Sequence, residues 1–387
     1  MQVTEVITPQ DKKAFLELPL KIYRDDSNWI RPLDSDIESV FDTAKNKFFR
    51  HGECTRWIVK DDSGNTIGRV AAFIDKKTAT KNNEQPTGGM GFFESVNNQE
   101  VAFLLFDTAK KWLQQKGMEA MDGPINFGER DSWWGLLVDG FSSPIYKMNY
   151  NPRYYQDFFE AYGFKTYFKQ FCYGLKVHNR LQEKFYERHA IIAADKNYTS
   201  CHIRKNQLEK FAEDFRQVYN KAWVKHGSGK ELEQKQTLQF FKKMKAVIDE
   251  KLVWYVYFKG EPVACWVNLP DINQIFKRFN GRFGWLEKLR FLWLFRTLKM
   301  DRFIGLVFGV VPEHQGKGVD SYMIVEGANV IQKERIYKDY EMQWIGDFNP
   351  KMITVAEGLG TWKSRTLITY RKLFDNEKEF KRHPMLG

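Results

Sequence analysis

Apolar residues in the first half of the chain form short runs and one stretch of helical period, which together predict strands alternating with helices. The runs at residues 57–60 and 67–74 flank a polar turn at residues 62–65, a pattern typical of a β-hairpin. Residues 88–95 predict a further strand. Residues 99–116 carry apolar side chains about every 3.6 residues and predict a helix. The first half therefore combines a hairpin, a strand and a helix.

The chain continues in the same alternating manner to its C-terminal end. Further helices are expected at residues 151–163, 207–224, 320–333 and 349–359, and further strands at 202–204, 252–258, 262–269, 303–311, 340–345 and 366–373. This order indicates an α/β fold in which a small mixed sheet has helices on both faces.

Length and composition divide this pattern into two units. At 387 residues the chain is too long for one ordinary core, and its 43% hydrophobic and 28% charged residues indicate a folded protein. We expect a first domain at residues 1–178, a charged connector at 179–197 and a second domain at 198–387. The second domain carries an insertion at residues 272–301.

The charge balance and the cysteines bear on partners and location. The net charge of +11 admits an anionic partner such as a CoA phosphate, nucleic acid or a membrane surface, and equally a basic surface without a specific partner. The polar N-terminus lacks a signal-peptide core, and the longest apolar stretch, residues 283–298, is interrupted by four charges. The scattered cysteines have no metal-ligand spacing. We therefore expect a cytoplasmic protein with free thiols and no metal site.

A glycine-containing loop between a strand and a helix is the sharpest chemical signal. The segment VVPEHQGKGVDSY ends a strand at Val310 and Val311 and enters a helix at Val319. Gly316 and Gly318 allow the backbone to approach a ligand closely. The amides of residues 315–319 would point from a helix N-terminus, a favourable place for an anion, and Lys317 adds positive charge.

This loop resembles the acyl-CoA loop of the GNAT superfamily of N-acyltransferases, written Q/R-x-x-G-x-G/A, with Gln315 and Gly318 in its first two defined places. The order of elements across residues 201–374 also resembles that fold. In the first half, NPRYYQDFFEAYGF at residues 151–164 resembles the final helix of a diverged second copy. GPINFG and WGLLVDGF, at residues 123–128 and 134–141, resemble segments of tandem, two-domain bacterial GNAT proteins.

The resemblance implies that acetyl-CoA or a longer acyl-CoA binds with its pyrophosphate on the loop and its thioester against the strand at residues 306–311. Three departures bear on activity. Asp320 occupies the last place of the loop, where the family has Gly or Ala. Ala356 stands where many members have the Tyr that protonates the leaving thiol. Residues 96–100 replace the loop in the first half without a glycine, so we expect no CoA there.

Four residues are candidates for the chemistry. Glu341 could accept the amine proton through a water, or be a surface carboxylate. His314 titrates near neutral pH, or is simply exposed on the loop. Tyr340 could replace the missing acid. Asn349 precedes Pro350 and is expected as a helix N-cap first and as a ligand contact second.

The insertion combines charge with aromatic side chains. Residues 275–302 hold eight Lys or Arg against Glu287 and Asp301, interleaved with Phe and Trp. A helix drawn through 285–300 is apolar on two sides, which predicts packing between layers. The alternatives are a lid over an acyl or lipid substrate and a foot on an anionic membrane.

These observations predict an N-acyltransferase that moves an acetyl or acyl group from acyl-CoA to a small-molecule or lipid-like amine. Two alternatives remain open from the sequence. One is acyl transfer from aminoacyl-tRNA on the same tandem fold. A weak phosphate loop and a basic surface would fit this alternative. The other is a catalytically degenerate pair that acts as a binding or membrane-associated module.

Overall fold

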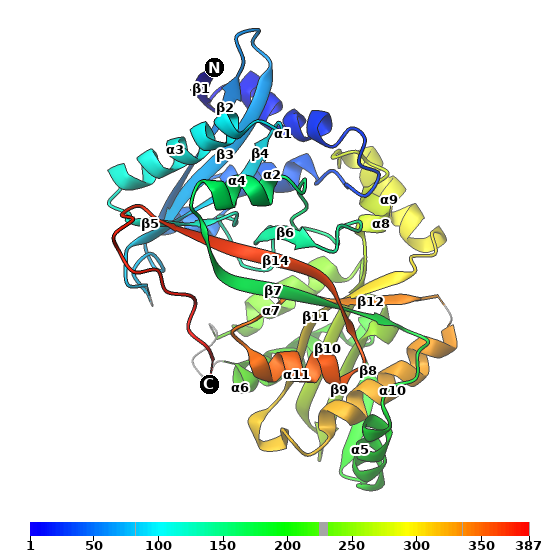
Figure 1. The fold of residues 1–387 in the computed structure, drawn as a ribbon. Helices are drawn as coiled ribbons and strands as arrows, with labels where there is room; N and C mark the ends of the chain where they lie inside the picture. The colour runs from blue at the N-terminus through cyan, green and yellow to red at the C-terminus, as the bar shows by residue number, and fades with distance from the viewer. Residues whose placement is uncertain (82, 224–230, 335, 387) are drawn as a thin grey trace.

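The computed structural model describes residues 1–81, 83–223, 231–334 and 336–386, and its centre is one mixed sheet (Figure 1). Twelve strands follow one another in the order β1-β2-β3-β4-β5-β14-β7-β12-β11-β10-β9-β8, while β13 pairs with β7 and β6 with β14. The expected α/β class with a mixed sheet is confirmed.

The first half of the chain folds into helices that alternate with strands of the central sheet. These are β1 (Gln2–Glu5), α1 (Pro9–Ile22), α2 (Asp34–Phe41), the 3-10 turn η1 (Lys47–Arg50), β2 (Gly52–Lys60), β3 (Thr66–Asp75), β4 (Thr87–Ser95), α3 (Gln99–Gln115), β5 (Ala120–Gly123), β6 (Leu136–Asp139), α4 (Tyr155–Ala161) and β7 (Lys165–Lys176).

The second half follows with a similar order. It contains α5 (Glu183–Ala194), β8 (Tyr198–His202), η2 (Lys205–Gln207), α6 (Leu208–Ala222), α7 (Gln234–Met244), η4 (Glu250–Leu252), β9 (Val253–Phe258), β10 (Glu261–Pro270), α8 (Asn273–Phe276), α9 (Trp285–Thr297), β11 (Arg302–Val310), η5 (Pro312–His314), α10 (Val319–Glu334), β12 (Asp339–Met342), β13 (Ile345–Gly346), α11 (Pro350–Gly358) and β14 (Trp362–Leu373).

Helices cover both faces of the sheet, as the alternation within β2 shows. Val59 packs in one core with side chains of α3, whereas its neighbour Ile58 packs with Phe15 of α1. Successive residues of a strand point to opposite faces, so α1 and α3 lie on opposite sides. A second large core surrounds β9, β10 and β11.

Some sequence expectations differ from the structure at element boundaries, among them the strand expected at residues 340–345, which is divided into β12 and β13. The strand expected at residues 202–204 is wrong: β8 lies at Tyr198–His202, because its backbone pairs with β9 from Tyr198↔Phe258 to His202↔Trp254. The connector at residues 179–197 contains the helix α5, which packs against α10. The helix expected at 207–224 is α6, and residue 224 lies outside the described residues.

The two halves exchange their last strands at the centre of the sheet. β14, from the C-terminal end of the chain, pairs with β5 of the first half, and β7 of the first half pairs with β12 of the second. Between them β7 and β14 form a long antiparallel pair from Trp362↔Gly174 to Arg371↔Lys165. The domain limits at residues 178 and 198 stay a prediction, since each half is completed by a strand from the other.

Leu367 of β14 tests this interlocking, because it is fully buried with Leu137 and Cys172. Leu367→Ala should lower the free energy of unfolding by roughly 2–5 kcal/mol. Unfolding should remain a single transition when followed by circular dichroism and by tryptophan fluorescence in urea. Ile191→Ala, at an exposed position of α5, is the matched control and should change stability by less than about 0.5 kcal/mol. Two separated transitions would contradict the shared centre.

Candidate active site

The paired strands β11 and β12 separate halfway along β11. They pair in parallel from Arg302↔Asp339 to Gly305↔Met342, and the last link is the hydrogen bond from the Gln343 amide to the Gly305 carbonyl, 3.1 Å. β12 then ends, while β11 continues to Val310. A bulge between β10 and β11 at Val267/Asn268 leaves one extra residue, Leu306, on β11 at the same point. The strands therefore open a gap in the sheet.

A cavity of about 510 Å³ runs through this gap. Leu306, Val307 and Phe308 all line it. Their side chains alternate between the two faces of the sheet, so the cavity passes between the strands and is not confined to one face. The other lining residues are mostly apolar and come from several elements: Leu175, Tyr219, Trp223, Trp266, Phe303, Ile324, Ala328, Ile331, Met342, Trp344, Met352, Ala356 and Leu359.

The loop that follows β11 has the conformation expected from its glycines. Gly316 and Gly318 have φ values of 73° and 95°, and α10 begins at Val319. A Cβ at Gly316 would meet nothing within 4 Å, so the loop surface is open there. In the described part of the chain the amides of residues 316–321 have no backbone or side-chain acceptor. Gly316 and Lys317 are exposed, so their amides are available to an anion, whereas Gly318 and Val319 are buried and Arg188 of α5 lies beside Gly318.

The corresponding place in the first half is closed by the chain itself. The Asn98 side chain accepts hydrogen bonds from the amides of Glu100 and Val101 at 2.8 and 3.3 Å and caps α3. The first amides of α3 are therefore occupied by the Asn98 side chain, whereas those of α10 are not.

Two predicted loop residues hold the loop in place. The Gln315 amide group donates to the Val310 carbonyl at 2.9 Å. His314 Nδ1 lies 2.7 Å from the Tyr198 hydroxyl, and its ring packs on Phe258. Partial burial, with Lys317 nearby, lowers the pKa of His314. The imidazole is thus neutral at physiological pH, but it does not line the cavity.

The other predicted loop residues differ in their surroundings. Lys317 is exposed to solvent. Val311 is held by the sheet, because its amide donates to the Val263 carbonyl at 2.9 Å. Asp320 is half-buried in the first turn of α10. Ser321, one residue further, has a fully buried hydroxyl without a partner among the described residues. Free amides, an open Gly316 and an orphaned hydroxyl fit a phosphate-bearing ligand, whereas the Asp320 carboxylate does not.

Tyr340 lines the cavity close to the point where β11 and β12 separate. Gly305 makes room for it, because a Cβ there would come within 2.1 Å of the Tyr340 oxygen. The Trp266 indole donates to that oxygen at 3.3 Å, which leaves the Tyr340 proton free for another acceptor. Burial raises the pKa of Tyr340 to about 12. Asn349 also lines the cavity and caps α11 by accepting from the Met352 amide at 3.3 Å, as expected.

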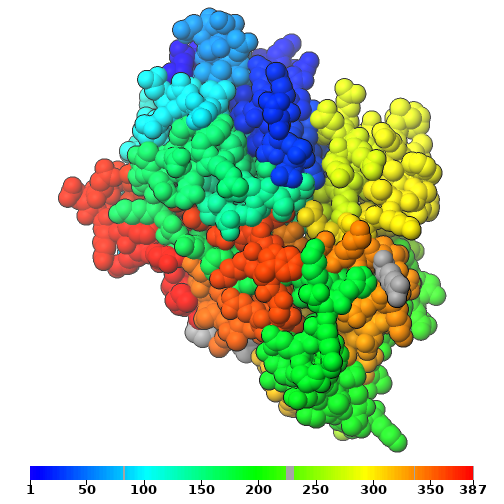
Figure 2. All heavy atoms as spheres, turned by 45° about the vertical axis from the view of Figure 1, so that its right-hand side comes forward, coloured from blue at the N-terminus to red at the C-terminus, as the bar shows by residue number. Residues whose placement is uncertain are grey.

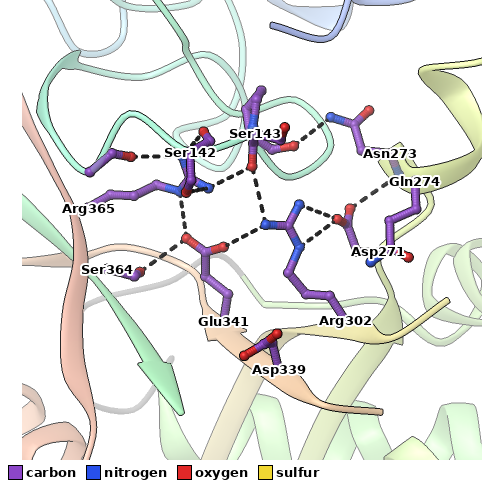
Figure 3. Close-up of polar contacts among 12 residues, drawn as sticks. Ser142, Ser143, Asp271, Asn273, Gln274, Arg302, Asp339, Glu341, Ser364 and Arg365 are labelled. Atoms are coloured by element: carbon purple, nitrogen blue, oxygen red, sulfur yellow. Dashed lines mark hydrogen bonds and ion pairs between the residues drawn. The ribbon is translucent and has the colours of Figure 1, made fainter. Parts of the chain in front are cut away.

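Glu341 points to the other side of β12 from Tyr340 and does not line the cavity. Its carboxylate accepts from Arg365 Nε at 2.6 Å and from the Ser364 hydroxyl at 3.1 Å, and Arg302 lies 3.5 Å away (Figure 3). The interpretation of Glu341 as a surface carboxylate is wrong, since it is 4% exposed. Its role as a base stays a prediction, and the two arginines favour a structural role.

The same arginines fasten the loop at residues 140–144 of the first half to the second half (Figure 3). Arg365 donates to the carbonyls of Gly140, Ser142 and Ser143 at 3.1, 2.6 and 2.7 Å. Arg302 holds the buried Asp271 with two hydrogen bonds of 2.6 and 2.8 Å. This cluster joins the two halves beside the site.

The apolar lining of the cavity was not found from the sequence. Trp223 and Trp266 come from α6 and β10, and their common position follows only from the way those elements meet at the gap. Residues 306–311 were expected at the site, and of these Leu306, Val307 and Phe308 line the cavity. No group of three or more His, Cys, Asp or Glu side chains in the described ranges is placed to hold a metal ion.

Comparisons with known proteins agree with this architecture. No protein-family model matches the chain. Bacterial ceramide synthase of Caulobacter vibrioides (strain NA1000 / CB15N) is 25% identical over 380 residues, which cover 96% of this chain and 97% of that protein. Protein YghO of Escherichia coli (strain K12) is 23% identical over 380 residues, covering 96% and 95%.

Among solved structures, a tandem GNAT protein from the clavulanic acid biosynthesis pathway matches with a TM-score of 0.55 and 10% identity. The match covers 97% of this chain and 99% of that one. The chain therefore has a tandem GNAT fold, and the two GNAT-like domains expected from its sequence are confirmed.

Removal of Arg365 tests the structural role of the Glu341 cluster. Arg365→Ala should lower the free energy of unfolding by roughly 3–5 kcal/mol, because it leaves the buried Glu341 carboxylate undercompensated. Arg365→Ala combined with Glu341→Gln should recover part of that loss, measured as a double-mutant cycle by urea denaturation. Two losses that simply add would contradict the coupling.

Proposed function

We propose that this protein is an N-acyltransferase that moves a long-chain acyl group from acyl-CoA to the amine of a lipid-like acceptor. The observation that carries the proposal is the apolar cavity in the gap between β11 and β12, directly before the glycine loop. The tandem GNAT fold supports acyl transfer as the reaction class.

The cavity supports a long acyl chain over an acetyl group. Its volume of about 510 Å³ falls in the range of sites for extended organic ligands. An acetyl group would leave most of this apolar space unfilled. Each methylene that enters it adds up to about 0.8 kcal/mol of affinity, or roughly fourfold.

The loop supports CoA as the carrier of that chain. In the proposed complex the pyrophosphate meets the free amides of residues 316–321, with Lys317 supplying charge. Because β11 runs from the cavity into this loop, one extended ligand can reach both. Asp320 opposes phosphate binding by charge repulsion, so Asp320 is the residue of the loop that limits affinity.

A lipid-like amine as acceptor is supported by the relative named bacterial ceramide synthase. A ceramide is a long-chain amino alcohol acylated on nitrogen, so the reaction that its name describes is N-acylation of a lipid amine. The sequence match extends over both halves of the chain, which supports the same reaction type here.

In the proposed reaction the neutral amine attacks the thioester carbonyl, the C–S bond breaks and the CoA thiolate leaves. Tyr340 donates a hydrogen bond to the departing sulfur. Its pKa of about 12 keeps it protonated throughout the physiological range, so it stabilises the thiolate by hydrogen bonding more than by complete proton transfer. His314 and Glu341 remain the candidates that receive the amine proton, and because neither lines the cavity, either would act through a water. His314 is the one that is neutral and not bound by an arginine.

A chain-length series tests the substrate class. Turnover with a long-chain amine such as sphinganine is measured by mass spectrometry against acetyl-, octanoyl- and palmitoyl-CoA. The value of kcat/KM should rise with chain length, by at least about a hundredfold between the acetyl and palmitoyl donors. Equal or better use of acetyl-CoA would refute the long-chain assignment, and neither turnover nor binding with any acyl-CoA would refute acyl transfer itself.

A substitution at Ala356 tests whether the cavity causes the preference for long-chain acyl-CoA. Ala356 is buried in α11 and lines the cavity, so Ala356→Phe should fill part of the space and lower kcat/KM for palmitoyl-CoA by at least about tenfold while sparing shorter donors. Ala193→Phe makes the same change at an exposed position of α5 and should leave the series unaltered.

Tyr340→Phe tests the role of the hydroxyl. The ring and its packing against Gly305 remain, so we expect kcat to fall by about a hundredfold with KM for acyl-CoA nearly unchanged. The free energy of unfolding should fall by roughly 1–3 kcal/mol, because the buried Trp266 indole N–H loses its acceptor, the Tyr340 oxygen. An unchanged kcat at saturating substrates would remove Tyr340 from the reaction.

A further inference from the structure

Helix α9 presents a row of large apolar side chains to solvent. Trp285, Leu286, Leu289 and Trp293 are 70%, 59%, 58% and 61% exposed. Their positions fall within an arc of roughly 100° on one side of the helix. Leu292 lies on the same side and is also exposed. Figure 2 shows this part of the chain, in yellow, on the outside of the molecule beside the N-terminal helices.

The opposite side of α9 is packed on the protein. Phe291 and Leu294 are buried with Phe276 of α8 and with Leu33 of the first half. The Asp34 amide donates to the Gly281 carbonyl at 2.8 Å, which fastens the insertion to the first half just before α9. Packing between two layers, as expected from the sequence, is therefore wrong, because only one of the two apolar sides has a protein neighbour among the described residues.

Basic side chains border the exposed apolar face. Lys288 and Arg290 lie about 100° to either side of its middle, and Arg296 lies at its C-terminal end. No carboxylate in the described part of the chain pairs with the exposed bases of this insertion: Lys277, Arg278, Arg282, Lys288, Arg290, Arg296 and Lys299. Of its two acids, Glu287 caps the Gly284 amide and Asp301 pairs with Lys338. The patch is thus apolar and cationic together.

We propose that α9 docks the protein on an anionic membrane surface. The helix would lie in the plane of the interface with Trp285, Leu289 and Trp293 in the acyl-headgroup boundary. Trp is favoured at that depth because its ring is apolar and its N–H is polar. The flanking Lys and Arg would meet anionic headgroups.

The chemistry of the patch favours a membrane over the other occupants. In the described ranges no helix is long and apolar enough to cross a bilayer, and α9 has 13 residues, so the contact is at the surface. A second copy of the chain docked on the same face would bring two sets of unpaired cations together, which like-charge repulsion opposes. An anionic membrane offers both partners: its headgroups pair with the basic side chains, and its acyl-headgroup boundary takes up the apolar side chains.

Vesicle co-sedimentation of the full chain, without acyl-CoA, tests this docking separately from acyl transfer. Vesicles of phosphatidylcholine alone are compared with vesicles that contain about 30 mol% phosphatidylglycerol. The protein should sediment with the anionic vesicles, bind the neutral ones at least about tenfold more weakly, and be released by about 0.5 M salt.

Two variants identify the surface. Trp285→Ser with Trp293→Ser should weaken binding to the anionic vesicles by at least about tenfold, with an unchanged circular dichroism spectrum, since both side chains are exposed. Phe240→Ser with Ile191→Ser removes two exposed apolar side chains from α7 and α5 and should leave binding unchanged.

No binding of the wild type to either vesicle would overturn the proposal, as would equal loss in the two variants. A concentration-dependent dimer in sedimentation velocity that the Trp variant dissociates would also overturn it, and would assign the face to a second copy of the chain.

Discussion

The antiparallel pair of β7 and β14 is the constraint on which the other features depend. Each strand comes from one half of the chain and completes the sheet of the other, so neither half has a finished sheet alone. This pair also fixes the position of β12, because β12 is hydrogen-bonded to β7 on one side. The position of β11 is set instead by its hydrogen bonds to β10. Strands held by different neighbours separate where β12 ends, and the cavity occupies the space between them.

Electrostatics strengthen the same centre. Arg365 belongs to β14 and binds both Glu341 of β12 and the carbonyls of residues 140–144, so three distant segments meet at one buried guanidinium. Such a cluster is stable only when each charge is paired. It lies on the face of β12 opposite to Tyr340, and so supports the site without entering it. The site itself is apolar within, and its loop carries Lys317 and Asp320, which have opposite charges.

Local patterns in the sequence predicted many of the helices, strands and turns. Contacts between residues far apart in the chain could not be predicted from those patterns. Hydrophobic period and turn residues located the hairpin of β2 and β3, and the spacing of Gln315, Gly316 and Gly318 located the loop, because these features are encoded within a few residues. The exchange of β7 and β14, the burial of Glu341 between Arg302 and Arg365, and the meeting of Trp223 with Trp266 depend on contacts between residues far apart in the chain. The two apolar sides of α9 were visible, but only packing decides which side is covered.

The most direct test of the account is a crystal structure of the full chain with a non-hydrolysable analogue of palmitoyl-CoA. The account predicts that the acyl chain lies in the gap between β11 and β12, in contact with Trp223, Trp266 and Tyr340, and that the pyrophosphate contacts the amides of residues 316–321. An acyl chain bound elsewhere, with the cavity still open and the loop amides free, would contradict it.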